Sequence, residues 1–167
     1  MKVLDMGSSL NPDIRATDAV EYDTNKRYLK KEEGYCISQA LDLGLTKDDI
    51  KKLQSHRNRN IKIIFGINYN DRVPYRNNTF DLVVSHASMA MLGEIYAYKE
   101  AYRVLKRGGI LEVGAAHLSD YDTGRVINHM TKSGFEIIAH KQKIQDTRLF
   151  FSNLKRMKND VIYGVKV

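Results

Sequence analysis

The chain has 167 residues, 43% of them hydrophobic, so a single globular domain spanning residues 1–167 is expected and two ordinary domains are excluded. Lysine and arginine outnumber aspartate and glutamate by 27 to 20, and the net charge of +7 favours contact with an anionic partner. Cys36 is the only cysteine, which excludes an intramolecular disulfide, argues against a cysteine-built metal site and suits a reducing cytoplasm. No apolar stretch approaches the ~20 residues of a membrane span, so a cytoplasmic protein without membrane contact is expected.

Short apolar runs rich in β-branched residues recur along the chain and predict strands, several of them buried on both faces. Helical patterns with capping residues or closing glycines lie between these runs. Strands that alternate with helices predict an α/β domain with a mostly parallel sheet covered on both faces. The segment 144–160 is expected to be a loop or short helix that can fold the last two strands back antiparallel. The predicted strands are 2–6, 60–67, 80–87, 109–116, 135–142 and 161–167, and the predicted helices are 46–58, 93–109 and 123–135.

The loop after the first strand is the first place to look for a ligand site, because open α/β sheets bind ligands at the carboxyl ends of their strands. Asp5 ends the strand, Gly7 permits a tight turn, and Ser8 and Ser9 offer donors to an anionic group. A dinucleotide-binding loop has three glycines and an acidic residue about 20 positions further on. The second and third glycines are missing here, so a nicotinamide enzyme is not expected. A plain structural turn at Gly7 is the alternative.

Three segments agree in order and spacing with one known family. Residues 4–12 read "LDMGSSLNP", residues 73–92 read "VPYRNNTFDLVVSHASMAML", and residues 100–113 read "EAYRVLKRGGILEV". Together they resemble the class I S-adenosylmethionine-dependent methyltransferases, particularly small members with an "LDIGCGxNP" loop. The resemblance implies a Rossmann-like sheet of seven strands with the last antiparallel. It also implies that the cofactor lies across the ends of the first, second and fourth strands.

The resemblance further implies which residues contact the cofactor. The loop with Asp5, Gly7, Ser8 and Ser9 would lie beneath its methionine part. The residues that follow the third strand would contact the adenine, by accepting from its amino group or stacking on the ring. The candidates there are Asn68, Tyr69 and Asn70, with Asp71 as an alternative in register, and a plain polar turn leading to Pro74 is the other interpretation. Ser85 is placed beside the transferable methyl group.

A carboxylate that ends the second strand would hold the ribose, because it accepts hydrogen bonds from both hydroxyls at once. Asp18 is the first choice for this role and Asp23 is the alternative. Only residues 7–13 would then separate the first two strands, whereas a parallel crossover normally takes a dozen or more residues. Either the first helix is nearly absent, or the second strand lies nearer "AVEYD" at 19–23.

Two histidines are the candidates for catalysis. The sulfonium of S-adenosylmethionine is already an activated methyl donor, so the main work of such an enzyme is to position the acceptor in line. A base helps when the acceptor must lose a proton, and histidine titrates near neutral pH. His86 follows the fourth strand and His117 follows the fifth, so both are expected at the cleft. A structural or surface role for each is the alternative.

The chain begins almost on its first strand, without the N-terminal helices that cover the cofactor in many members of this family. The pocket is therefore expected to be open, or completed by a second subunit, a partner protein or a large acceptor. The segments 25–31, 51–62 and 148–158 combine cations with aromatics and could bind nucleic acid, or simply be solvated helix faces. The favoured function is a methyltransferase of unknown acceptor. The alternatives are a non-catalytic cofactor-binding or scaffold protein and a nucleic-acid methyltransferase.

Overall fold

The computed structural model describes residues 1–7, 15–21, 61, 63–65, 67, 71–86, 88–92, 94–116, 120–145 and 157–167. The strands of this part are β1 (Val3–Met6), β2 (Asp18–Glu21), β3 (Ile63–Phe65), β4 (Phe80–His86), β5 (Leu105–Ala116), β6 (Phe135–Gln145) and β7 (Met157–Lys166). Its helices are α3 (Ser88–Leu92), α4 (Ile95–Val104) and α5 (Asp120–Lys132). None of these three helices is long and apolar enough to cross a membrane. The predicted helix 46–58 lies outside the described residues.

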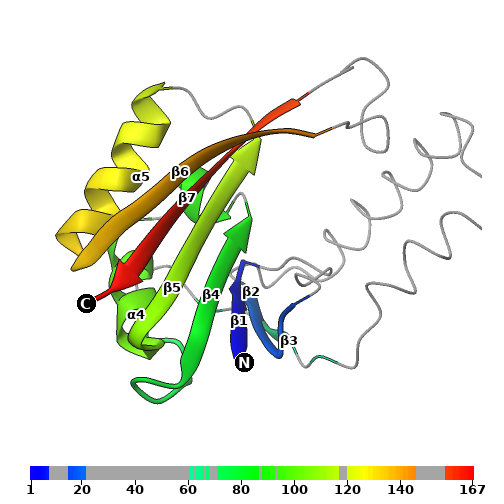
Figure 1. Ribbon diagram of the computed structural model, residues 1–167. Helices are drawn as coiled ribbons and strands as arrows, with labels where there is room; N and C mark the ends of the chain where they lie inside the picture. The colour runs from blue at the N-terminus through cyan, green and yellow to red at the C-terminus, as the bar shows by residue number, and fades with distance from the viewer. Residues whose placement is uncertain are drawn as a thin grey trace, which may run out of the picture.

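All the strands belong to one mixed sheet of seven strands in the order β3-β2-β1-β4-β5-β7-β6 (Figure 1). Neighbouring strands from β3 to β5 pair in parallel. Strand β7 lies between β5 and β6 and pairs antiparallel with both. The predicted Rossmann-like α/β sheet with an antiparallel last strand is therefore confirmed. The strand order reverses between β1 and β4, which places the ligand crevice of such a fold at the carboxyl ends of these two strands.

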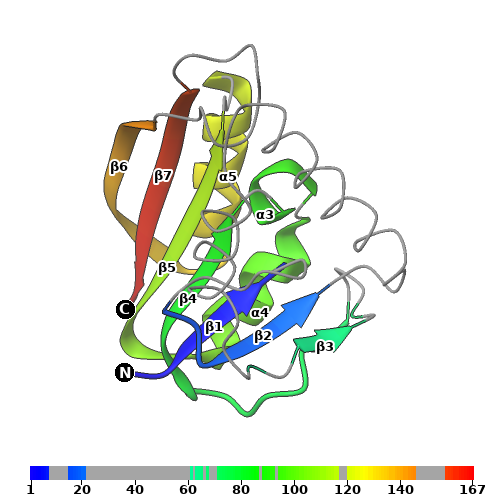
Figure 2. The ribbon, with the colours of Figure 1, turned by 90° about the vertical axis from the view of Figure 1, so that its right-hand side faces the viewer.

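The three described helices lie on one face of the sheet (Figures 1 and 2). Helix α4 shows why: its buried residues Ala97, Tyr98, Ala101 and Val104 recur with helical spacing and form one apolar stripe. This stripe packs into the main core, to which Leu4, Met6, Val83, Leu111 and Val113 contribute from the strands. The opposite face carries a smaller apolar cluster of Val3, Leu82 and Val84, with Ile110 packed against it.

Several predicted boundaries of helices and strands are wrong. The helix predicted over 93–109 ends at Val104, and Leu105 is already extended, with a ψ of 142°, and pairs with Phe80 of β4. Pairing with β4 outweighs the local helical pattern there, and the glycine pair that seemed to close a helix lies inside β5. The β6–β7 hairpin is longer than predicted, because β6 continues to Gln145 and β7 begins at Met157.

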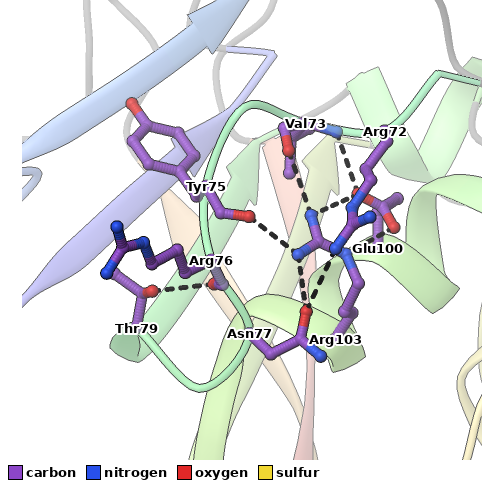
Figure 3. A network of polar contacts seen from close by, with 8 residues as sticks. All are labelled: Arg72, Val73, Tyr75, Arg76, Asn77, Thr79, Glu100 and Arg103. Atoms are coloured by element: carbon purple, nitrogen blue, oxygen red, sulfur yellow. Dashed lines mark hydrogen bonds and ion pairs between the residues drawn. The ribbon is translucent and has the colours of Figure 1, made fainter.

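An arginine on α4 holds the segment between β3 and β4 (Figure 3). Nε and Nη2 of Arg103 donate to the two carboxylate oxygens of Glu100, each at 2.7 Å. The same guanidinium donates to the carbonyl oxygens of Tyr75 at 2.7 Å and Val73 at 3.0 Å, and to Oδ1 of Asn77 at 2.9 Å. The Glu100 carboxylate also accepts from the backbone N–H of Val73 at 2.9 Å. Three of the five N–H donors of the guanidinium thus hold this segment directly, and the other two orient Glu100, which binds the backbone N–H of Val73.

Candidate functional site

The turn after β1 has the geometry that a close approach to a ligand requires. Gly7 has a φ of 85°, in the left-handed region that side chains with a Cβ rarely adopt. Its backbone N–H donates to the carbonyl oxygen of Val20 on β2 at 2.9 Å. This hydrogen bond holds the turn at Gly7 against β2, the neighbouring strand, at the carboxyl edge of the sheet.

A pair of serines joins β4 and α3 to this turn. Oγ of Ser88 donates to the carbonyl oxygen of Met6 at 3.1 Å and lies 3.5 Å from that of Gly7. Oγ of Ser85 lies 3.2 Å from Oγ of Ser88 and accepts from the backbone N–H of Met89, also at 3.2 Å. Ser85 is fully buried, so its hydroxyl supports the edge from beneath rather than from within an open cleft. Sequence reasoning missed Ser88, although it lies in the same "SHASM" segment.

Asp5 lies near the carboxyl end of β1, within a row of residues across three strands. It is 3% exposed and pairs with Val84 of β4, which pairs in turn with Glu112 of β5. Residues paired across strands lie on the same face of a sheet, so two buried carboxylates flank Val84 there. Arg15 pairs with Glu112 through two hydrogen bonds. Sequence reasoning missed this pair, although a lone acid in the apolar run "GILEVGAA" was a usable signal.

The placement of Asp18 at the end of the second strand is wrong. Asp18 is the first residue of β2 and pairs with Leu4, so it lies toward the amino edge of the sheet, away from Gly7. There its Oδ2 accepts from Oγ1 of Thr17 at 2.8 Å and lies 3.9 Å from Nζ of Lys2. Burial, with a smaller contribution from the Asp18 charge, raises the pKa of Tyr75 to about 12. The second strand occupies "DAVE", close to the alternative position near "AVEYD".

Several predicted residues lie outside the described part of the chain. His86 is the last residue of β4, where its backbone pairs with Gly114, and nothing is described of its side chain. The basic segments 25–31 and 51–62, apart from Ile61, are outside, as is 148–156 of the third. Among the described residues, no group of three or more His, Cys, Asp or Glu side chains could hold a metal ion. The other predicted residues outside the description are Ser8, Ser9, Asp23, Asn68, Tyr69, Asn70 and His117.

Comparisons with solved structures find the same fold in several methyltransferases. A methyltransferase of Thermotoga maritima described as S-adenosylmethionine-dependent aligns with a TM-score of 0.62 at 16% identity, over 99% of this chain and 82% of that one. One of Methanosarcina mazei with the same description aligns with a TM-score of 0.58 at 14% identity, over 99% and 92%. A chain from a complex between a methyltransferase activator and a methyltransferase of Haloferax volcanii gives 0.59 at 11% identity, over 99% and 82%.

A comparison of the amino-acid sequence with models of protein families identifies the family. Residues 50–163, more than half of the chain, match the model of a family described as hypothetical methyltransferase. The chain therefore belongs to this methyltransferase family and has the fold of the S-adenosylmethionine-dependent enzymes. A comparison with curated proteins gave no match.

Proposed function

We propose that this protein binds S-adenosylmethionine at the carboxyl ends of β1, β2 and β4 and transfers its methyl group to an acceptor. The observation that carries this proposal is the turn at Gly7, with its φ of 85°, at the strand-order reversal of a methyltransferase-family sheet. When bound, the cofactor supplies a methyl carbon that an acceptor lone pair attacks as the carbon–sulfur bond breaks, leaving the electron pair on sulfur in S-adenosylhomocysteine. The chain's own task is to hold the two molecules in line.

The residues proposed to hold the cofactor follow the strand ends. Asp5, Gly7, Ser8 and Ser9 form or support the loop beneath its methionine part, and Ser85 supports that loop through Ser88. The ribose is assigned to Glu21, the carboxylate that ends β2, because Asp18 opens that strand instead of ending it. Asp23, two positions further along the chain, is the alternative. The adenine is assigned to the residues after β3, namely Asn68, Tyr69 and Asn70.

Calorimetry with S-adenosylmethionine and S-adenosylhomocysteine tests the cofactor site. Wild-type protein is expected to bind both, and Glu21→Ala is expected to weaken binding by about tenfold or more through loss of a charged hydrogen-bond acceptor. Asp18→Ala is the matched control, because it removes a carboxylate from the opposite end of β2. Wild-type protein that binds neither ligand contradicts the proposed function. Equal weakening by both variants contradicts the assignment of the ribose to Glu21.

The base is assigned to His86 or His117, which come from the ends of the adjacent parallel strands β4 and β5. His86→Gln or His117→Gln is expected to lower methyl transfer by about 100-fold or more while the affinity for S-adenosylhomocysteine stays unchanged. His140→Gln is the control and is expected to leave methyl transfer unchanged, because His140 lies on β6, the edge strand farthest from β1 and β2. There its Nε2 lies 2.9 Å from a carboxylate oxygen of Asp160.

The measurement is tritium transfer from labelled S-adenosylmethionine into separated protein, nucleic-acid and small-molecule fractions of cell extract. Label in one fraction identifies the class of acceptor, and label in nucleic acid supports the role proposed for the basic segments. A protein that binds the cofactor but labels no fraction is a non-catalytic binding protein. One chain of similar fold comes from a complex with an activator protein, so the assay is also run with proteins that co-purify.

A further inference from the structure

A bidentate ion pair that crosses the sheet lies outside the residues assigned to the cofactor. Glu112 is in the middle of β5, with β4 on one side and β7 on the other, and its side chain is 8% exposed. Nη1 of Arg15 donates to its Oε2 at 2.9 Å, and Nη2 donates to its Oε1 at 2.8 Å. This bidentate arrangement fixes the orientation of the Arg15 guanidinium as well as its distance from the Glu112 carboxylate.

The pair connects two parts of the sheet that do not touch through the backbone. Arg15 belongs to the segment that joins β1 to β2, whereas Glu112 lies on β5, and β4 stands between β1 and β5. The arginine therefore reaches over β1 and β4 on the face that carries Val3 and Val84. It ends in the row of Asp5, Val84 and Glu112.

The joining segment is unusually short for a parallel crossover. It runs from Gly7 to Thr17, and its two ends are held by backbone bonds, Gly7 N–H to Val20 O at 2.9 Å and Thr17 N–H to Val3 O at 2.8 Å. Most parallel crossovers contain a helix that packs on the sheet and fixes their position. The pair between Arg15 and Glu112 gives this short crossover a fixed side-chain contact with the middle of the sheet.

Stability alone is a weak reason for such a pair. The Arg15 side chain is 37% exposed, which screens the attraction, and the desolvation of the buried Glu112 carboxylate offsets much of what remains, so apolar replacements of similar size are often as stable. A bidentate pair does fix the position of the two side chains relative to each other. We infer that the pair between Arg15 and Glu112 is a positioning device, which ties the end of the β1–β2 crossover to β5 and so helps to fix the turn at Gly7, where the proposed cofactor site begins. This inference rests on the proposed function.

The test replaces both charges by apolar side chains of similar size, Arg15→Met with Glu112→Leu. The variant is expected to keep the thermal midpoint of the wild type but to bind S-adenosylhomocysteine about fivefold or more weakly, because the turn at Gly7 is no longer pre-organised. Without cofactor, the amides of Gly7 and Thr17 are expected to exchange hydrogen about fivefold or more faster. The matched control is Lys106→Met with Asp81→Asn, which removes an exposed ion pair at the opposite edge and is expected to change neither value.

The outcomes separate this inference from the proposed function. If the wild type and the double variant bind S-adenosylhomocysteine equally well and their amide exchange rates are the same, the inference is overturned and the proposed function is not affected. A wild type that does not bind contradicts the proposed function, and the exchange rates then decide by themselves whether the pair anchors the crossover. If the double variant does not fold, Glu112→Gln replaces it, because it keeps the shape and is expected to shift both values in the same direction by less.

Discussion

Arg103→Ala is expected to lower the free energy of unfolding by about 3 kcal/mol, the scale for removing one partner of a mostly buried ion pair. Arg103 and Glu100 are 16% and 15% exposed, and the arginine also holds the carbonyls of Val73 and Tyr75 and the side chain of Asn77 (Figure 3). Without the guanidinium, Glu100 stays largely buried with its charge and two carbonyls lose a donor. Thermal unfolding should show a fall of roughly 6–12 °C in Tm for a chain of this size.

Arg103→Lys separates the charge from the geometry. A lysine keeps the positive charge but cannot supply five donors in a planar fork, so about half of the loss is expected to remain. Asn77→Ala removes one acceptor and is expected to cost about 1 kcal/mol. An Arg103→Ala variant within 0.5 kcal/mol of the wild type would show that other contacts hold the segment between β3 and β4.

Gly109→Ala is expected to destabilise the protein by about 2–3 kcal/mol, because the new methyl group has no room. A Cβ at position 109 would lie 2.8 Å from the carbonyl oxygen of Lys106, 3.2 Å from that of Asp81 and 3.0 Å from Cδ2 of Leu105. Two of these atoms belong to the backbone, so the chain between Lys106 and Gly109 would have to change conformation and β5 would have to move away from the start of β4. Urea unfolding gives the free-energy difference directly.

Gly108→Ala is the matched comparison at the preceding residue. Gly108 has a φ of 76° and no atom within 4 Å of an added Cβ, so only the strain of a left-handed alanine is expected, about 1 kcal/mol. Gly108→Asn should cost less than Gly108→Ala, since asparagine tolerates this conformation better. A larger loss at Gly108 than at Gly109 would contradict the assignment of steric contact to Gly109.

Local sequence pattern was sufficient to predict most of the sheet. The apolar runs at 2–6, 80–87, 109–116, 135–142 and 161–167 each overlap an observed strand, because β-branched residues with little polar interruption favour a buried extended backbone. The order of the motifs also predicted the methyltransferase fold, which the family match and the similar structures confirm. Gly7 was identified as a tight turn from its neighbours alone, and its positive φ agrees.

Strand register could not be predicted from the same pattern. The pairing of Leu4 with Asp18 moves Asp18 to the amino edge, and the pairing of Leu105 with Phe80 begins β5 where a helix was expected. Both outcomes depend on which residues of a distant strand lie opposite, and a shift of a few positions changes the edge at which a side chain lies.

The links that hold the site together join residues far apart in the sequence. Arg15 and Glu112 are 97 positions apart, and Ser88 and Met6 are 82 apart. Each contact forms because β1, β4 and β5 are neighbours in the sheet, and helical or strand propensity carries no information about that adjacency. Local sequence thus determined which segments become strands and where the chain turns at Gly7. Strand order and register depend on the packing of the whole chain, and they decided that Arg15 and Glu112 form an ion pair on the sheet.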